Sequence, residues 1–170
     1  MKGCVFAGTF DPITIGHEHV INECLSKYGK VLVVVGKNPR KTQLFSEEDR
    51  VALIKQAFSG QKDVEVLAYS TKADGYAEFL RQNDYDVYVR GIRNQADLKM
   101  ENAMKDINAK LYPFIKTEYI NVTGEVASVS SSDVRERILN GKDWLEYIPQ
   151  KAQSLAKSLV DKLNDKQTEN

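Results

Sequence analysis

Five short apolar runs along the chain predict buried β-strands, at residues 2–7, 31–35, 64–69, 87–89 and 118–122. The run at 31–35 is continuous and β-branched, which is typical of a strand covered by helices on both faces of its sheet. Between the runs the apolar period is helical. Strands that alternate with helices predict an α/β fold with a doubly wound, five-stranded parallel sheet and right-handed crossovers.

Start and stop signals place helices between these strands. Residues 46–49 resemble a capping box for a helix that Gly60 ends. A run of serines opens a later helix that Gly141 stops, and Pro149 opens the last one. The helix predicted at residues 94–111 aligns apolar side chains on one face, namely Met100, Met104, Ile107 and Leu111.

Length and composition favour a single domain. A chain of 170 residues with 42% apolar content can bury one sizeable core, which we expect within residues 1–164, followed by a polar, frayed tail at 165–170. No apolar run approaches the ~20 residues that cross a bilayer, and no signal peptide is recognisable, so we expect a cytoplasmic protein without membrane contact. Cys4 and Cys24 have no metal or redox spacing and are expected to be buried thiols.

The first candidate site is the loop at residues 8–17. It follows the first predicted strand, turns at Asp11-Pro12 and leads into a helix, at whose start His17 would lie. Free N–H groups at a helix start favour an anion. Ligands in such folds bind beyond the carboxyl ends of the strands, so we expect residues 38–41, 90–93 and 130–132 at the same edge as this loop.

Only a few basic side chains stand out as candidates for binding phosphate. Lys and Arg together equal Asp and Glu at 24 each, which argues against a nucleic-acid partner, because such binding needs a positive excess over a whole face. Arg90 and Arg93 supply forked donors suited to phosphate, and Lys41 supplies a mobile point charge. The alternatives are a solvated Lys41 and ion pairs of the two arginines with Asp97 or Glu101.

These residues together resemble a known family. Thr14-Ile15-Gly16-His17 is similar to the Thr/His-x-Gly-His tetrad of the nucleotidyltransferase superfamily. The further match of residues 38–41 with Phe45, 90–101 and 129–132 resembles phosphopantetheine adenylyltransferase. The resemblance implies a Rossmann-like nucleotidyltransferase fold, commonly a homohexamer. Its implied reaction joins ATP and 4'-phosphopantetheine, giving dephospho-coenzyme A and pyrophosphate with Mg²⁺, in coenzyme A biosynthesis.

The same resemblance implies site residues. The catalytic residues would be His17, Lys41 and Arg93, and the acceptor would bind Thr9, Lys41, Tyr76 and Arg90. No side chain is expected to ligate a metal, since Mg²⁺ would arrive with ATP. The implied ATP-binding residues are Thr9, Phe10, His17, Gly91, Ile92, Arg93, Glu101, Val126, Ala127, Ser128, Val129, Ser130, Ser131 and Ser132.

The chain departs from the family pattern on the acceptor side. Residues 74–78, around Tyr76, replace the usual Leu-Leu/Met-Val/Ala-Asn/Asp strip, and Val126 replaces an aromatic residue. The alternatives therefore include transfer to another phosphorylated acceptor, such as nicotinamide mononucleotide or glycerol phosphate. A further alternative is a nucleotide-binding sensor that transfers nothing.

Overall fold

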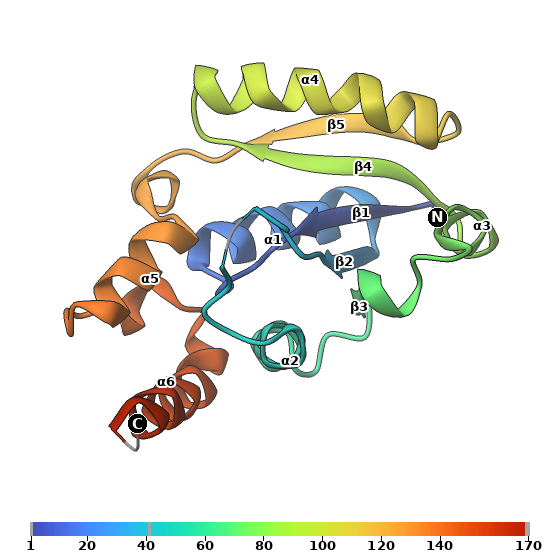
Figure 1. Ribbon diagram of the computed structural model, residues 1–170. Coiled ribbons are helices and arrows are strands. Elements are labelled where there is room, and N and C mark those ends of the chain that lie inside the picture. Colours follow the sequence, from blue (N-terminus) through green and yellow to red (C-terminus); the bar gives the residue numbers. More distant parts are fainter. Residues whose placement is uncertain (1, 41, 169–170) are drawn as a thin grey trace.

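The computed structural model describes residues 2–40 and 42–168, so Lys41 lies outside the described residues. A five-stranded sheet in the order β3-β2-β1-β4-β5 forms its centre (Figure 1). All neighbouring strands are parallel. The strands are β1 (Gly3–Gly8), β2 (Val31–Val35), β3 (Val64–Ala68), β4 (Tyr85–Ile92) and β5 (Lys116–Asn121).

Helices cover both faces of this sheet, which confirms the doubly wound fold. The helices are α1 (Ile15–Tyr28), α2 (Glu47–Ala57), α3 (Tyr76–Gln82), α4 (Gln95–Leu111), α5 (Ser131–Leu139) and α6 (Gln153–Thr168). Short 3-10 turns lie at Tyr69–Thr71, Glu125–Ser128, Leu145–Tyr147 and Gln150–Ala152. None of the helices in the described part of the chain is long and apolar enough to cross a membrane.

The hydrophobic core consists of two clusters, one on each face of the sheet. On one face, side chains of β1 and β2 such as Phe6 and Val33 pack with α1, α2 and α6. On the other, Val5 and Val34 pack with α3 and with the segment that follows α4. Cys4 and Cys24 are both buried in the first cluster as free thiols, as expected.

The strand order reverses between β1 and β4. The chain leaves β1 towards β2 on one side and reaches β4 and β5 on the other, so these two central strands mark the switch point. Their carboxyl ends lie on the same edge of the sheet (Figure 1). The loops that follow them carry the candidate residues of the sequence.

Three details differ from the sequence expectations. β4 extends beyond the predicted 87–89 because β5 pairs along it as far as Asn121, and this places Arg90 and Gly91 inside the strand. α6 continues to Thr168, into the segment expected to fray, since that segment lacks glycine and proline and contains good helix formers. On α4, Met100 and Leu111 are 72% and 61% exposed; the side chains of Met104 and Ile107 lie outside the described part.

Candidate active site

A cavity of about 340 Å³ lies at the carboxyl ends of β1 and β4. Its walls come from the loop after β1, the start of α1, the end of β4, α4 and the start of α5. The structure brings most of the expected ATP-binding residues together here, because the cavity is lined by Thr9, Phe10, His17, Gly91, Arg93, Glu101, Val129, Ser130, Ser131 and Ser132.

Four expected ATP-binding residues do not line this cavity. Ile92 is buried in the sheet. Val126, Ala127 and Ser128 form a 3-10 turn that packs against α1, where the Val126 carbonyl oxygen would lie 3.2 Å from a Cβ added to Gly16. A side chain at position 16 would therefore push the turn away from α1.

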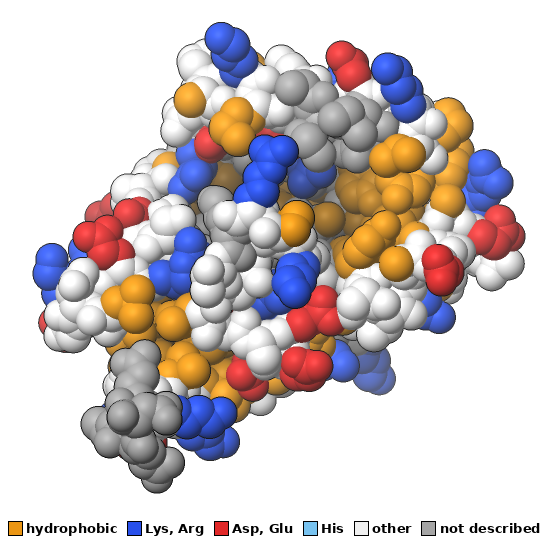
Figure 2. Space-filling model, viewed as in Figure 1, with side chains coloured by type: hydrophobic (Ala, Val, Ile, Leu, Met, Phe, Trp, Pro, Cys, Tyr) orange, Lys and Arg blue, Asp and Glu red, His pale blue; other side chains and the backbone are white. Residues whose placement is uncertain are grey.

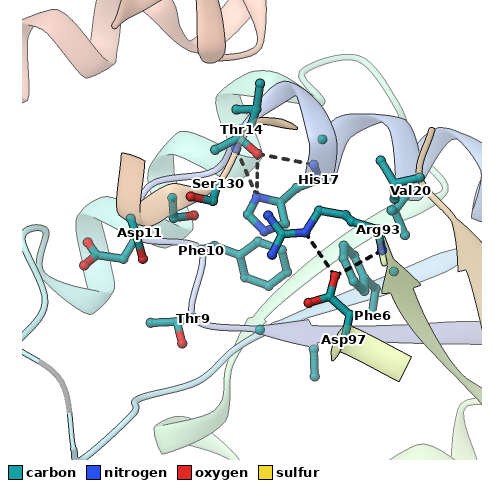
Figure 3. Close-up of a pocket in the computed structure, with 18 of the residues that line it drawn as sticks. Phe6, Thr9, Phe10, Asp11, Thr14, His17, Val20, Arg93, Asp97 and Ser130 are labelled. Carbon is teal, nitrogen blue, oxygen red and sulfur yellow. Dashed lines mark hydrogen bonds and ion pairs between the residues drawn. The ribbon is translucent and has the colours of Figure 1, made fainter. Parts of the chain in front are cut away.

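His17 is held by the N-terminus of its own helix. Thr14 is the N-cap of α1, and its main-chain N–H donates to His17 Nδ1 at 3.0 Å. A nitrogen that accepts a hydrogen bond carries no proton, so the proton of the neutral ring lies on Nε2. Figure 3 shows the ring between Thr14 and the Arg93 guanidinium.

The His17 ring is neutral at physiological pH. Burial, reinforced by the positive charge of Arg93, lowers the pKa of His17 to about 4. The ring also packs edge-on against Phe10, with centroids 4.9 Å apart. His17 therefore offers an oriented N–H donor to an anion in the cavity, without a charge of its own.

Both candidate arginines form ion pairs, as the alternative interpretation of the sequence allows. Arg93 Nε lies 3.2 Å from Asp97 Oδ2, which also accepts from the Arg93 main-chain N–H at 3.0 Å. Arg90 Nε lies 3.2 Å from Glu101 Oε2. All four residues line the cavity, so the carboxylates orient the guanidinium groups within it.

The serines connect α5 to the loop after β1. Ser130 caps α5 and accepts from the Asp133 N–H at 3.1 Å. Ser131 Oγ donates to the Pro12 carbonyl oxygen at 2.8 Å. Capping and contact with the site are thus combined in one segment, as the sequence suggests.

A second cavity, of about 440 Å³, adjoins the first. The two cavities share Ala7, Gly8, Thr9 and Arg90, and the second also receives Tyr76. Three of the four residues expected to bind the acceptor, Thr9, Tyr76 and Arg90, therefore lie together; the fourth, Lys41, lies outside the described residues.

Four tyrosines form one wall of this second cavity. Tyr69, Tyr76, Tyr88 and Tyr112 line it, and the hydroxyls of Tyr76 and Tyr88 lie 2.7 Å apart. Burial raises the pKa of Tyr76 to about 12 and also raises that of Tyr88, so both phenols are neutral. Figure 2 shows an apolar patch near α3 and the end of α4, beside lysine and arginine side chains at the centre of the same face.

Three residues that stabilise the site are missing from the sequence expectations. Asp11, 2% exposed, accepts from the N–H groups of Leu44 and Phe45 at 2.8 and 2.9 Å. Arg135 donates to the Asp11 carbonyl oxygen at 2.7 Å and lines the first cavity. Arg50 is buried beneath the loop after β1. Only Arg135 carries a sequence signal, since it follows the serines by one helical turn.

Comparison with known proteins identifies the family. The model of the cytidylyltransferase-like family matches residues 5–137. Phosphopantetheine adenylyltransferase of Phocaeicola vulgatus is 36% identical over 150 residues, 88% of this chain and 97% of the relative. The enzyme of that name from Thermotoga neapolitana is 34% identical, over 95% of this chain and 96% of its own. The chain belongs to the phosphopantetheine adenylyltransferase family. The expected nucleotidyltransferase class is thereby confirmed.

Solved structures support the fold. A bifunctional NMN adenylyltransferase/ADP ribose pyrophosphatase from Francisella tularensis superposes with a TM-score of 0.69 at 18% identity. The match covers 94% of this chain and 50% of that one. A second structure of that protein, complexed with AMP and a manganese ion, gives a TM-score of 0.65. At this identity the likeness concerns the fold alone.

Proposed function

We propose that this member of the phosphopantetheine adenylyltransferase family transfers the adenylyl group of ATP to 4'-phosphopantetheine, giving dephospho-coenzyme A and pyrophosphate. ATP would occupy the first cavity and the acceptor the second. The observation that carries the proposal is the junction of the two cavities at Thr9 and Arg90. Two phosphorylated substrates bound in the two cavities would meet at this junction.

The reaction needs no covalent enzyme intermediate. A phosphate oxygen of the acceptor attacks the α-phosphorus of ATP and forms a new P–O bond, while the bond to the bridging α–β oxygen breaks and pyrophosphate leaves. The nucleophile is already an anion, so catalysis consists of positioning and of stabilising charge. His17 Nε2–H and the Arg93 guanidinium are the donors for the developing charge on the phosphates, and Arg90 orients the acceptor phosphate. On the family resemblance alone, Lys41 is included in the proposal as a catalytic residue that contacts the acceptor phosphate.

Magnesium belongs to the proposal as a companion of ATP. Among the described residues, no group of three or more His, Cys, Asp or Glu side chains gathers that could hold a metal. Mg²⁺ commonly binds through substrate phosphates and water with only one or two carboxylates. The cavity carboxylates Asp97 and Glu101 are paired with Arg93 and Arg90, so the ion would be held by the triphosphate and water. When bound, it would neutralise charge on the departing pyrophosphate.

The assembly is a second part of the proposal. Met100 on α4 is 72% exposed and lines neither cavity, and large exposed apolar side chains occur at protein–protein contacts. We propose that α4 contacts another copy of the chain in a homo-oligomer, a hexamer by family resemblance. A cytoplasmic location, where ATP is available, and a single domain at residues 1–164 complete the proposal.

The deciding experiment measures pyrophosphate release by the purified protein with ATP and Mg²⁺. We expect release with 4'-phosphopantetheine, and far less with unphosphorylated pantetheine, which lacks the anion for Arg90. Nicotinamide mononucleotide serves as the competing acceptor. Release with the mononucleotide and none with 4'-phosphopantetheine would retain the adenylyl transfer and refute the acceptor.

A further inference from the structure

Arg50 on α2 is a charged side chain buried behind the site. It is 2% exposed and lines neither cavity. Its Nη1 donates to the main-chain carbonyl oxygens of Thr9 at 2.6 Å and of Gly36 at 2.7 Å. Within the described residues no carboxylate pairs with it, and its Nε has no hydrogen-bond partner.

These contacts fix the orientation of one peptide group at the junction of the cavities. In a trans peptide the C=O and the following N–H point in opposite directions. Because the Thr9 carbonyl is directed at Arg50, the Phe10 N–H is directed away from Arg50. Thr9 and Phe10 both line the first cavity. This N–H donates no hydrogen bond to another group in the described part of the chain.

The backbone at this point needs such support. Phe10 has a φ of 50°, in the left-handed region that residues other than glycine rarely adopt. Its ring is buried between Phe6 and His17, so the side chain cannot relax outwards. The hydrogen bond from Arg50 compensates for this unfavourable conformation of the loop.

The second contact of Arg50 extends its effect to the neighbouring strand. Gly36 follows β2 and lines the second cavity, and its N–H donates to the Gly8 carbonyl oxygen at 2.8 Å. One guanidinium thus joins the loops after β1 and β2 at the place where the cavities meet. Both hydrogen bonds come from Nη1, and a lysine side chain is one bond too short to place its nitrogen at the same point.

We propose that Arg50 is a positioning residue for adenylyl transfer: it holds the Thr9–Phe10 peptide so that the Phe10 N–H donates to a phosphate of ATP. Its unpaired positive charge adds to the attraction of the site for anions. This inference rests on the proposed function in that it takes ATP as the ligand of the first cavity. It concerns the main chain at position 10, and it is testable without any transfer of the adenylyl group.

The test compares Arg50→Lys and Arg50→Met with a matched control, Leu53→Ala. Leu53 is fully buried on the same helix and contacts neither cavity, so its truncation lowers the melting temperature without touching the loop. Protein labelled with ¹⁵N at its 6 phenylalanines is titrated with ATP and no acceptor. The Phe10 amide signal is assigned with Phe10→Leu.

We expect ATP to shift the Phe10 amide in the wild type and in Leu53→Ala, and to shift it little in Arg50→Lys. In steady-state assays, kcat/KM for ATP should fall at least about tenfold in Arg50→Lys and Arg50→Met, and stay near the wild-type value in Leu53→Ala below its melting temperature. Should Arg50→Met fail to fold, Arg50→Lys gives the answer alone.

Two results would overturn the inference. One is a Phe10 amide signal that does not shift when ATP is added to the wild type. The other is an Arg50→Lys variant that loses thermal stability and keeps both its kcat/KM and its amide response, as Leu53→Ala should. Failure of the proposed function has a different signature: ATP shifts the Phe10 amide of the wild type, but no acceptor leads to pyrophosphate release.

Discussion

The main-chain N–H of Thr14 donates to Nδ1 of His17 at 3.0 Å, and this bond determines what the histidine does in the cavity. It completes a capping box in which His17 takes the place usually held by glutamate or glutamine. The ring cannot turn without losing the cap, so the proton remains on Nε2. The start of α1 and the chemistry of the site thus depend on the same contact.

Replacing His17 separates these two roles. His17→Ala should fold but lose about 10²–10³ in kcat, because it removes a positioned donor to the developing phosphate charge. His17→Gln can restore the cap through its amide oxygen, so it should melt at a higher temperature than His17→Ala. Pyrophosphate release and thermal unfolding measure the two effects. Near-normal turnover of a folded His17→Ala would remove the residue from the mechanism.

The low pKa of His17 predicts a pH dependence of stability. Between its ordinary value of about 6.5 and the folded value of about 4, the unfolded chain binds a proton that the folded protein does not. The free energy of unfolding should therefore fall as the pH drops through this window. His17→Gln should weaken the dependence, and His19→Gln on the same helix is the control. Equal slopes for both variants in urea unfolding from pH 4 to 6.5 would contradict the lowered pKa.

The sequence predicts the site better than it predicts the scaffold behind it. His17, Arg93 and the serines lie at helix starts or after strands, Arg90 lies near the end of β4, and parallel strands bring such positions to one edge. Arg50 and Asp11 have no comparable signal, because a charge inside an amphipathic helix or a turn is normally solvated. Their burial depends on how α2 and the loops after β1 and β2 meet, which local patterns do not encode.

Replacing Arg93 and replacing Arg90 should affect the binding of different substrates. Arg93 lines only the first cavity, whereas Arg90 lines both. Arg93→Ala should weaken the binding of ATP by roughly 1.5–3 kcal/mol, about ten- to a hundredfold in Kd, and leave the binding of the acceptor nearly unchanged. Arg90→Ala should weaken the acceptor most. Calorimetric titration of each variant with each substrate measures this, and an equal loss of the same ligand in both variants would refute the division.

If α4 lies in an interface between copies of the chain, a charge introduced on its exposed face should weaken the oligomer. Met100 lines neither cavity, so Met100→Glu should not disturb substrate binding directly. If α4 contacts another copy, a buried carboxylate there should dissociate the oligomer. Light scattering of wild type, Met100→Glu and the surface control Lys142→Glu gives the masses. A wild-type protein that is monomeric at assay concentration would dismiss the proposed interface.

The tyrosine wall was only partly predictable. Tyr76 stands out in the sequence because it replaces an aliphatic residue of the family pattern, but Tyr69, Tyr88 and Tyr112 come from separate segments. The rings of Tyr69 and Tyr112 meet Tyr76 edge-on, with centroids 5.2 and 5.7 Å from it. Such a cluster depends on the packing of α3 against β4 and the end of α4, which no single segment specifies.

The buried hydroxyls of Tyr76 and Tyr88 form a pair that should contribute to stability as a unit. Tyr76→Phe or Tyr88→Phe alone leaves one phenol without its partner, which should cost about 1–3 kcal/mol of stability. The double variant removes both hydroxyls, so its loss should be smaller than the sum of the single losses, and urea unfolding of the four proteins gives the coupling.

On the acceptor, Tyr76→Ala should act more strongly than Tyr76→Phe. It removes an aromatic surface, at ~25 cal/mol per Å² of apolar area left uncovered, so KM for 4'-phosphopantetheine should rise about tenfold or more, while KM for ATP remains near the wild-type value. The two substrates occupy different cavities, and Tyr76 lines only the second. If KM for ATP rose instead, the assignment of the two cavities would have to be exchanged.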